Sequence, residues 1–202
     1  MAERRRGTDL ENAILDAAWA EIGEKGYAGL TMENAAARAG TSRPVLSRRW
    51  SNVSALATAA IQRELIRRPI AVPDLGDLRE ELLSFLQQAS RRADVFTAGF
   101  ALFLDEFQRG TKASPSEFRA TVLAGEEDAL ETILARAVAR GEIDPGKLLP
   151  PTASLPADLF RHHVIMTMAP PSLDMQQAWI DDIFLPLTRF GGQGGDLECT
   201  SI

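Results

Sequence analysis

The chain has 202 residues, 45% of them hydrophobic and 25% charged, which is the ordinary range for one or two globular domains. No apolar run approaches the roughly 20 residues that a membrane-spanning helix needs, and no apolar stretch follows the basic N-terminus, which argues against a secretory signal. The single cysteine, Cys199, excludes an internal disulfide and a cysteine metal cluster. We therefore expect a cytoplasmic protein without a metal or cofactor.

Charge is distributed unevenly along the chain. The whole chain carries a net charge of −6, but residues 1–70 hold 11 Lys and Arg against 8 Asp and Glu, a net charge of +3. The remaining residues carry −9. A basic end joined to an acidic remainder is expected when one end of a protein meets phosphate and the other does not.

The first predicted helix covers residues 9–25, where apolar residues recur at helical spacing. Thr8 or Asp9 is expected to cap its start, and Gly26 to end it. The arginine-rich residues 1–8 precede it. They form either a solvated tail or an arm that contacts DNA.

Residues 31–50, TMENAAARAGTSRPVLSRRW, are typical of two short helices joined by a tight turn. Thr31 is placed to cap the first helix and Ser42 the second, while Gly40 supplies the turn between them without steric cost. This is the layout of a helix-turn-helix, whose second helix enters the major groove of DNA.

The second of these helices is expected to carry arginines on its outer face, with Leu46 and Trp50 in the core. Arg43 is expected to read a base, because a guanidinium can donate two hydrogen bonds to guanine. Arg48 and Arg49 are suited to phosphate contact, and a solvated helix face is the alternative for each arginine. The full set of expected DNA contacts is Thr31, Thr41, Ser42, Arg43, Pro44, Val45, Ser47, Arg48 and Arg49.

Helical patterns continue to the end of the chain, and no strand pattern or internal repeat is evident. A fourth helix is expected over 52–68, followed by a stiff connector at 69–73. The later helices are predicted over 75–92, 94–109, 114–141, 154–169 and 173–190, with Pro186 bending the last one. The sequence thus predicts an all-α fold of about nine helices, with domains at 1–68 and 74–190 and a disordered tail at 191–202.

Residues 9–57 resemble the DNA-binding domain of the tetracycline-repressor (TetR) family of bacterial transcriptional regulators. The resemblance rests on ILDAAWAEIGEKGYAGLTMENAAARAGTSRPVLSRRW, followed by an Ala-Leu in the fourth helix. Ser47 stands where the family commonly has a tyrosine, and Val53 where it has a lysine. Both family residues typically touch phosphates, so these two contacts are put in doubt.

The resemblance implies a homodimer on a palindromic DNA operator, formed by the last two helices. The implied interface residues are Leu159, Phe160, Val164, Trp179, Ile183 and Leu187. Their periodicity fits an ordinary core equally well.

The resemblance also implies that the C-terminal domain binds a small effector, here an apolar one. The residues that can line its pocket are Phe96, Phe100, Phe103, Phe107, Phe118, His163, Met166 and Trp179, and a plain hydrophobic core is the alternative. His162 and His163 point about 100° apart on a helix, which makes them a poor pair for one metal ion.

Three functions follow, in order of preference. The first is a ligand-responsive DNA-binding regulator, most simply a repressor that leaves its operator when the effector binds. The second is a helical interaction or ligand-sequestering dimer that has lost DNA binding, which Ser47 and Val53 keep open. An enzyme comes last, because no nucleophile, base and orienting residue occur at plausible spacing.

Overall fold

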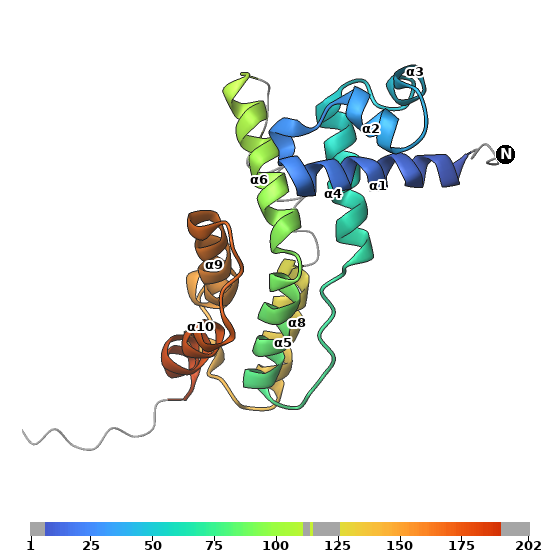
Figure 1. The fold of residues 1–202 in the computed structure, drawn as a ribbon. Helices are drawn as coiled ribbons and strands as arrows, with labels where there is room; N and C mark the ends of the chain where they lie inside the picture. The colour runs from blue at the N-terminus through green and yellow to red at the C-terminus, as the bar shows by residue number, and fades with distance from the viewer. Residues whose placement is uncertain (1–6, 111–113, 115–125, 191–202) are drawn as a thin grey trace, which may run out of the picture. The chain divides into compact units, whose positions relative to one another are not determined.

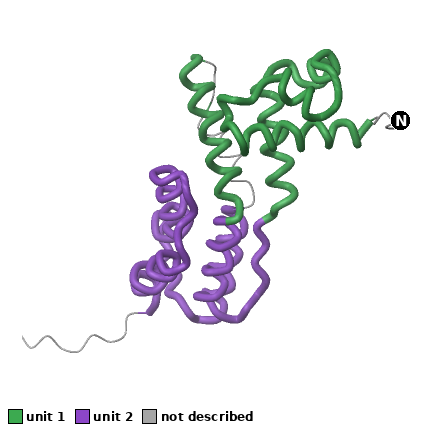
Figure 2. Tube along the Cα trace, in the orientation of Figure 1, with its two compact units in different colours: residues 1–69, 91–125 green, residues 70–90, 126–202 purple. Residues whose placement is uncertain are grey.

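All regular secondary structure in the part of the chain that the structure describes is helical, which confirms the predicted all-α class (Figure 1). The structure, a computed structural model, describes residues 7–110, 114 and 126–190. The chain divides into two compact units, unit 1 with residues 1–69 and 91–125 and unit 2 with residues 70–90 and 126–202 (Figure 2). The expected domain boundaries stay a prediction. The units differ from them in placing residues 91–125 with the N-terminal part.

Unit 1 contains the predicted helix-turn-helix and the helices that support it. Its elements are α1 (Thr8–Lys25), the short 3-10 helix η1 (Tyr27–Gly29), α2 (Met32–Arg38), α3 (Arg43–Ser47), α4 (Val53–Arg67) and α6 (Ala93–Gln108). Helix α4 packs against both α1 and α6. The buried side chains of this core include Ile14, Ala18, Ala35, Leu46, Trp50, Leu56, Ile61, Val95 and Ala98. Helix α6 therefore belongs to this unit because its own apolar face completes the core.

The ends of these helices follow local chemistry in most places. Gly26 ends α1 with a positive φ of 71°, and the Thr31 side chain accepts a hydrogen bond from the Asn34 amide at 3.0 Å. Asn52 caps α4 in the same way, through the Ala55 amide at 2.8 Å. One predicted cap is wrong: the N-cap of α1 is Gly7, which has no side chain with which to cap it.

Tyr27 links η1 to α6 within unit 1. Its hydroxyl donates a hydrogen bond to Oδ2 of Asp105 at 3.2 Å, and the side chain is buried. Burial, reinforced by the Asp105 carboxylate, raises the pKa of Tyr27 to about 12. The neutral phenol is thus the form that the fold stabilises.

Because Tyr27 is the only tyrosine of the chain, its titration can be observed directly. We expect the phenolate absorbance to rise with a midpoint near pH 12 in the folded protein, against about 10 in the unfolded chain. Between these two values the folded state holds the proton more tightly, so the contribution of Tyr27 to stability is complete below pH 10 and is lost as pH rises. Circular dichroism recorded alongside separates this titration from unfolding. A midpoint near 10 in folded protein would contradict the buried contact.

Unit 2 is a helical layer around α5. Its elements are α5 (Leu78–Ser90), α8 (Glu126–Ala139), the 3-10 helix η2 (Pro145–Lys147), α9 (Pro150–Thr167), α10 (Leu173–Ala178), the π-helical segment η3 (Trp179–Phe184) and α11 (Leu185–Thr188). Helix α5 packs against α8, α9 and α10, and α9 packs against η3. The fully buried side chains include Leu78, Leu82, Phe85, Leu86, Ile133, Phe160 and Phe184. The first part of the predicted helix 114–141 lies outside the described residues except for Ser114.

The last predicted helix contains a π-helical segment before Pro186, and the bend expected at this proline stays a prediction. Residues 173–188 run as α10, then a π-helical turn, then α11, in which Pro186 lies in the first turn. Proline has no N–H to donate, and its ring crowds the carbonyl of Asp182 four residues earlier. A wider π turn just before the proline relieves this conflict.

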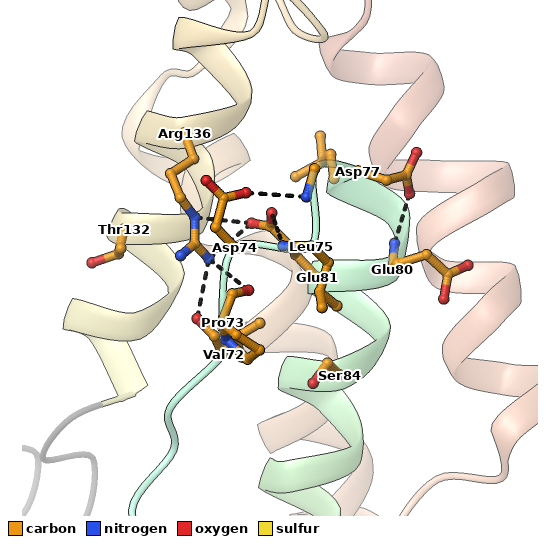
Figure 3. Close-up of polar contacts among 12 residues, drawn as sticks. Val72, Pro73, Asp74, Leu75, Asp77, Glu80, Glu81, Ser84, Thr132 and Arg136 are labelled. Carbon is orange, nitrogen blue, oxygen red and sulfur yellow. Dashed lines mark hydrogen bonds and ion pairs between the residues drawn. The ribbon is translucent and has the colours of Figure 1, made fainter.

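The connector after residue 69 is bound to unit 2 by a buried ionic cluster on α5 and α8. Glu81 on α5 is fully buried and meets Arg136 at 2.9 Å and Arg140 at 3.1 Å. Figure 3 shows Arg136 directed toward Glu81 and toward the carbonyls of Val72 and Pro73, to which it donates hydrogen bonds at 3.2 and 3.4 Å. These hydrogen bonds attach the connector to α8 within unit 2, and its stiffness stays a prediction.

The same cluster also fixes the start of α5. The amide of Leu75 donates to Oε1 of Glu81 at 3.1 Å, and the amide of Leu78 donates to Oε2 of Glu142 at 2.8 Å. Amides at the start of a helix have no partner within the helix, so Glu142 supplies the acceptor for Leu78, while Oδ1 of Asp77 accepts from the Glu80 amide at 2.9 Å.

Candidate nucleic-acid interface

Helices α2 and α3 are held at a defined angle by the turn between them. The amides of Gly40 and Thr41 donate to the carbonyls of Ala37 and Ala36 at 3.1 and 3.0 Å. Gly40 has a φ of 67°, a conformation that side chains rarely adopt, so glycine is required at this position. The turn predicted from Ala39-Gly40-Thr41 is therefore present.

The expected DNA-binding residues gather on and around α3. Leu46 and Trp50 are buried in the core as predicted, and Val45 is half-buried against it. Ser42 occupies the N-cap position of α3, but its side chain makes no capping hydrogen bond. The exposed members of the set are Ser42, Arg43, Pro44, Ser47, Arg48 and Arg49, while Thr31 and Thr41 are half-buried.

The recognition helix is shorter than the sequence suggested. Helix α3 ends at Ser47, and Arg48 and Arg49 lie in the turn that follows it. The amides of Arg49 and Trp50 both donate to the Leu46 carbonyl, which tightens the chain and places Trp50 in the core. Only Arg43 therefore projects from the helix itself, and the other two arginines extend from its C-terminal turn.

Two carboxylates contact the arginines of this surface, and sequence reasoning missed both. Nε of Arg43 lies 3.0 Å from Oε1 of Glu33 on α2, and Nη1 of Arg49 lies 2.6 Å from Oε2 of Glu11 on α1. Arg48 has no ion pair within the described residues. These partners belong to different helices, so their spacing along the chain offers no signal.

Arg38 stabilises the packing of α2 against α1 and is not part of the exposed arginine surface around α3. It forms ion pairs with Glu24 and, at 2.7 Å, with Glu21, which also meets Lys25 at 2.8 Å. The hydrogen bond from Lys25, with that from Arg38, outweighs the effect of burial and lowers the pKa of Glu21. This cluster ties α1 to α2 and so fixes the position of the helix-turn-helix.

The two positions that depart from the family pattern differ in their surroundings. Ser47 is exposed at the end of α3. Val53 begins α4 and is half-buried against the core of unit 1. Val53 therefore packs where a lysine would extend into solvent, and no phosphate contact is available from its side chain.

The residues expected to line an effector pocket fall in both units. Phe96 is buried, Phe100 and Phe103 are half-buried, and Phe107, 63% exposed, stacks with Phe103 at a ring-centroid distance of 6.1 Å. All four lie on α6 in unit 1. His163, Met166 and Trp179 lie in unit 2, and Phe118 lies outside the described residues. A shared pocket for this set stays a prediction.

One side of α9 and the adjoining face of η3 and α11 carry apolar side chains toward solvent. Met166 is 70% exposed, Ile183 37% and Leu187 52%. The rings of His163 and Trp179 meet edge to face at 5.9 Å, which joins the two faces. We call the set Leu159, His163, Met166, Trp179, Ile183 and Leu187 the C-terminal apolar face.

Two residues of the expected dimer interface, Phe160 and Val164, do not lie on this face. Phe160 and Val164 are fully buried inside unit 2, because they point from α9 toward its core. They have no surface with which to meet a partner. The other expected residues, Leu159, Trp179, Ile183 and Leu187, are half-buried or exposed.

Family models cover most of the chain. Residues 14–60 match the model of bacterial regulatory proteins of the tetR family, and residues 72–183 match that of the tetracyclin repressor-like C-terminal domain. The chain belongs to the TetR family. An uncharacterized HTH-type transcriptional regulator of Mycobacterium tuberculosis is 31% identical over 170 residues, which is 84% of this chain and 83% of that protein.

Solved structures of TetR proteins share the fold. A TetR transcriptional regulator from Agrobacterium tumefaciens aligns with a TM-score of 0.65 at 18% identity, over 91% of this chain and 96% of that one. The multidrug binding protein EbrR, complexed with ethidium, aligns with a TM-score of 0.57 at 20% identity, over 90% and 99% of the two chains. At such identities the likeness concerns the fold alone.

The family settles the broad function. The protein is a helix-turn-helix DNA-binding transcriptional regulator of the TetR family and not an enzyme. No helix among the described residues is long and apolar enough to cross a membrane. Within the same residues no group of three or more His, Cys, Asp or Glu side chains is placed to hold a metal ion.

Proposed function

We propose that this TetR protein binds a palindromic DNA operator as a homodimer and releases it when a small apolar effector binds. The observation that carries the proposal is the exposed arginine surface of α3 and its following turn, held by a buried core behind it. Arg43 at the start of α3 is suited to a base, and Arg48 and Arg49 to phosphates.

The small size of one DNA-binding domain supports the proposal that two copies bind together. A single small DNA-binding module buries roughly 600–1,000 Å² of protein surface, at the low end for specific binding. Two heads about 34–36 Å apart would engage two half-sites one DNA turn apart. The C-terminal apolar face supports the pairing, because contiguous exposed apolar side chains mark protein contacts.

The effector response is supported by the family of the C-terminal segment and by the neighbour that was solved with ethidium. An effector can act only if its affinity differs between the DNA-competent and DNA-incompetent states. Repression is the simplest outcome of such a difference, because effector binding then lowers the occupancy of the operator. The residues proposed to contact the effector are those expected from the sequence, with Phe107 and Met166 the most exposed of them.

Selection of bound duplexes from a random pool tests the proposal with the purified full chain. We expect a palindrome with half-sites one turn apart, and an affinity that falls steeply as salt rises. Failure to enrich any sequence would refute the operator and favour the ligand-sequestering dimer that Ser47 and Val53 keep open.

Replacing Arg43 with alanine should remove about 1–3 kcal/mol of discrimination at one base pair of each half-site. Arg48→Ala is the matched comparison, because it should weaken binding to all duplexes about equally and lower the salt dependence by about one charge. Titrations of the selected site and of its single-base variants provide both measurements. An equal loss on every duplex for Arg43→Ala would refute its role in base reading.

A further inference from the structure

The ion pair between Glu33 and Arg43 joins two firmly held helices. Glu33 lies in the first turn of α2, where Thr31 caps the helix and Met32 is buried. Arg43 begins α3, which is anchored by Leu46 at 0% exposure. Because both backbones are fixed by the core, the pair restricts the direction of the Arg43 side chain.

The geometry of this pair leaves the base-reading edge of the guanidinium available. The carboxylate of Glu33 lies against Nε of Arg43, at 3.0 Å. The terminal amino groups of Arg43 make no hydrogen bond within the described residues. These two groups form the fork that can donate together to O6 and N7 of guanine.

Arg49 offers an instructive contrast. Its partner Glu11 takes a terminal amino group, Nη1, at 2.6 Å, so a contact with guanine through both terminal amino groups would have to displace the carboxylate. The same type of pair thus presents the fork of Arg43 and occupies that of Arg49. The side chains of Arg43 and Glu33 are 63% and 61% exposed, and an operator can reach both.

We propose that Glu33 is a positioning residue for base recognition, holding the Nε edge of Arg43 so that its terminal fork meets a guanine. This rests on the proposed operator binding. A carboxylate on this surface also repels phosphates, so Glu33 weakens binding to DNA of any sequence while it sharpens the choice of base. Glu33 therefore lowers the affinity for DNA of any sequence and raises the preference for one base.

The test compares Glu33→Ala and Glu33→Gln with the wild type on three duplexes. These are the selected operator, the operator changed at the base pair where Arg43→Ala loses discrimination, and an unrelated duplex. We expect both variants to bind the unrelated duplex about two- to fivefold more tightly, since one negative charge is gone. The preference for the operator over its changed form should fall about five- to tenfold.

Two further variants make the outcome decisive. In the background of Arg43→Ala, removal of Glu33 should leave the remaining preference unchanged, because Glu33 acts only through Arg43. Glu11→Ala is the matched control, and it should tighten binding to every duplex while preserving the preference. The thermal midpoint should stay within about 2 °C of wild type for all of these exposed sites, which excludes a merely structural effect.

Equal tightening on all three duplexes would overturn the proposal and leave Glu33 as a repelling charge alone. No change on any duplex would overturn it as well. A wild-type protein that prefers no site would instead refute operator binding itself, so the two failures are distinguishable.

Discussion

Replacing Glu81 with alanine is expected to lower the free energy of unfolding by about 3 kcal/mol. Glu81 is fully buried, and it balances the charges of Arg136 and Arg140, whose side chains are only 22% and 23% exposed. Its removal leaves the guanidinium of Arg136 without its carboxylate, while Arg140 keeps its ion pairs with Asp74 and Glu142. The amide of Leu75 also loses its acceptor. The effect is set at the lower end of the range for buried pairs because both arginines retain some contact with water.

Glu80→Ala is the matched control for this experiment. Glu80 is adjacent on α5, but it is 59% exposed and pairs with Arg79 at the surface. Its replacement should cost no more than about 1 kcal/mol. Urea unfolding at one fixed protein concentration measures both variants, which keeps any contribution from dimerisation constant. Similar losses for the two variants would contradict the account of the buried cluster.

The connector gives a second readout of the same substitution. Arg136 holds the carbonyls of Val72 and Pro73 only while Glu81 orients its guanidinium. Amides of residues 71–77 should therefore exchange with solvent faster in Glu81→Ala, while the amides of α1 should keep the wild-type rate. The exchange rates of these connector amides in Glu81→Gln should lie between those of the wild type and of Glu81→Ala. The glutamine side-chain oxygen can still accept a hydrogen bond from the Leu75 amide, although the charge is lost.

Local features of the fold could be predicted because their causes lie within a few residues. Thr31 and Gly26 act on the helix ends next to them, and the spacing of Leu46 and Trp50 determines which side of the helix-turn-helix is buried. Gly7 shows the limit of such reasoning. Thr8 and Asp9 are better capping residues, yet the helix starts one residue earlier than a side-chain cap would place it.

Contacts between distant residues could not be predicted, because nothing in the chain marks their partners. Glu81 and Arg136 are 55 residues apart, and a glutamate on an amphipathic helix normally faces water. Glu33 likewise gives no hint that it meets Arg43. The aromatic stripe of α6 has helical spacing throughout, but that spacing does not reveal that Phe96 is buried and Phe107 exposed.

The residues of the expected dimer interface could not be separated from the core by sequence alone, for a related reason. Phe160 and Val164 share the helical period of α9 with Leu159, and the sequence does not distinguish the core side from the outer side. In α11 the difficulty is the π turn before Pro186, which shifts the phase of the helix. Once both are seen, Ile183 and Leu187 remain as the apolar side chains of η3 and α11 that a second copy can cover.

The double substitution Ile183→Glu and Leu187→Glu is expected to abolish the dimer at the concentrations used for DNA binding. Covering each aliphatic side chain contributes up to about 1.5–3 kcal/mol, and a glutamate in its place adds the cost of burying a charge. Together these raise the dissociation constant of the dimer by at least about a hundredfold. Sedimentation equilibrium gives this constant directly. The fold should persist, since Ile183 and Leu187 are already 37% and 52% exposed in the single chain.

Loss of the dimer should carry over to DNA, because two linked heads hold a palindrome that one head holds only weakly. The double variant should lose at least about a hundredfold in operator affinity, while its binding to a single half-site should stay close to that of the wild type. Ile66→Glu is the matched control: Ile66 is 79% exposed on α4, outside the C-terminal apolar face, and its substitution should leave the dimer intact. A double variant that remains dimeric and binds the palindrome at full strength would show that another surface joins the two copies, and the exposed residues of α10, Leu173 and Met175, would then be the next to replace.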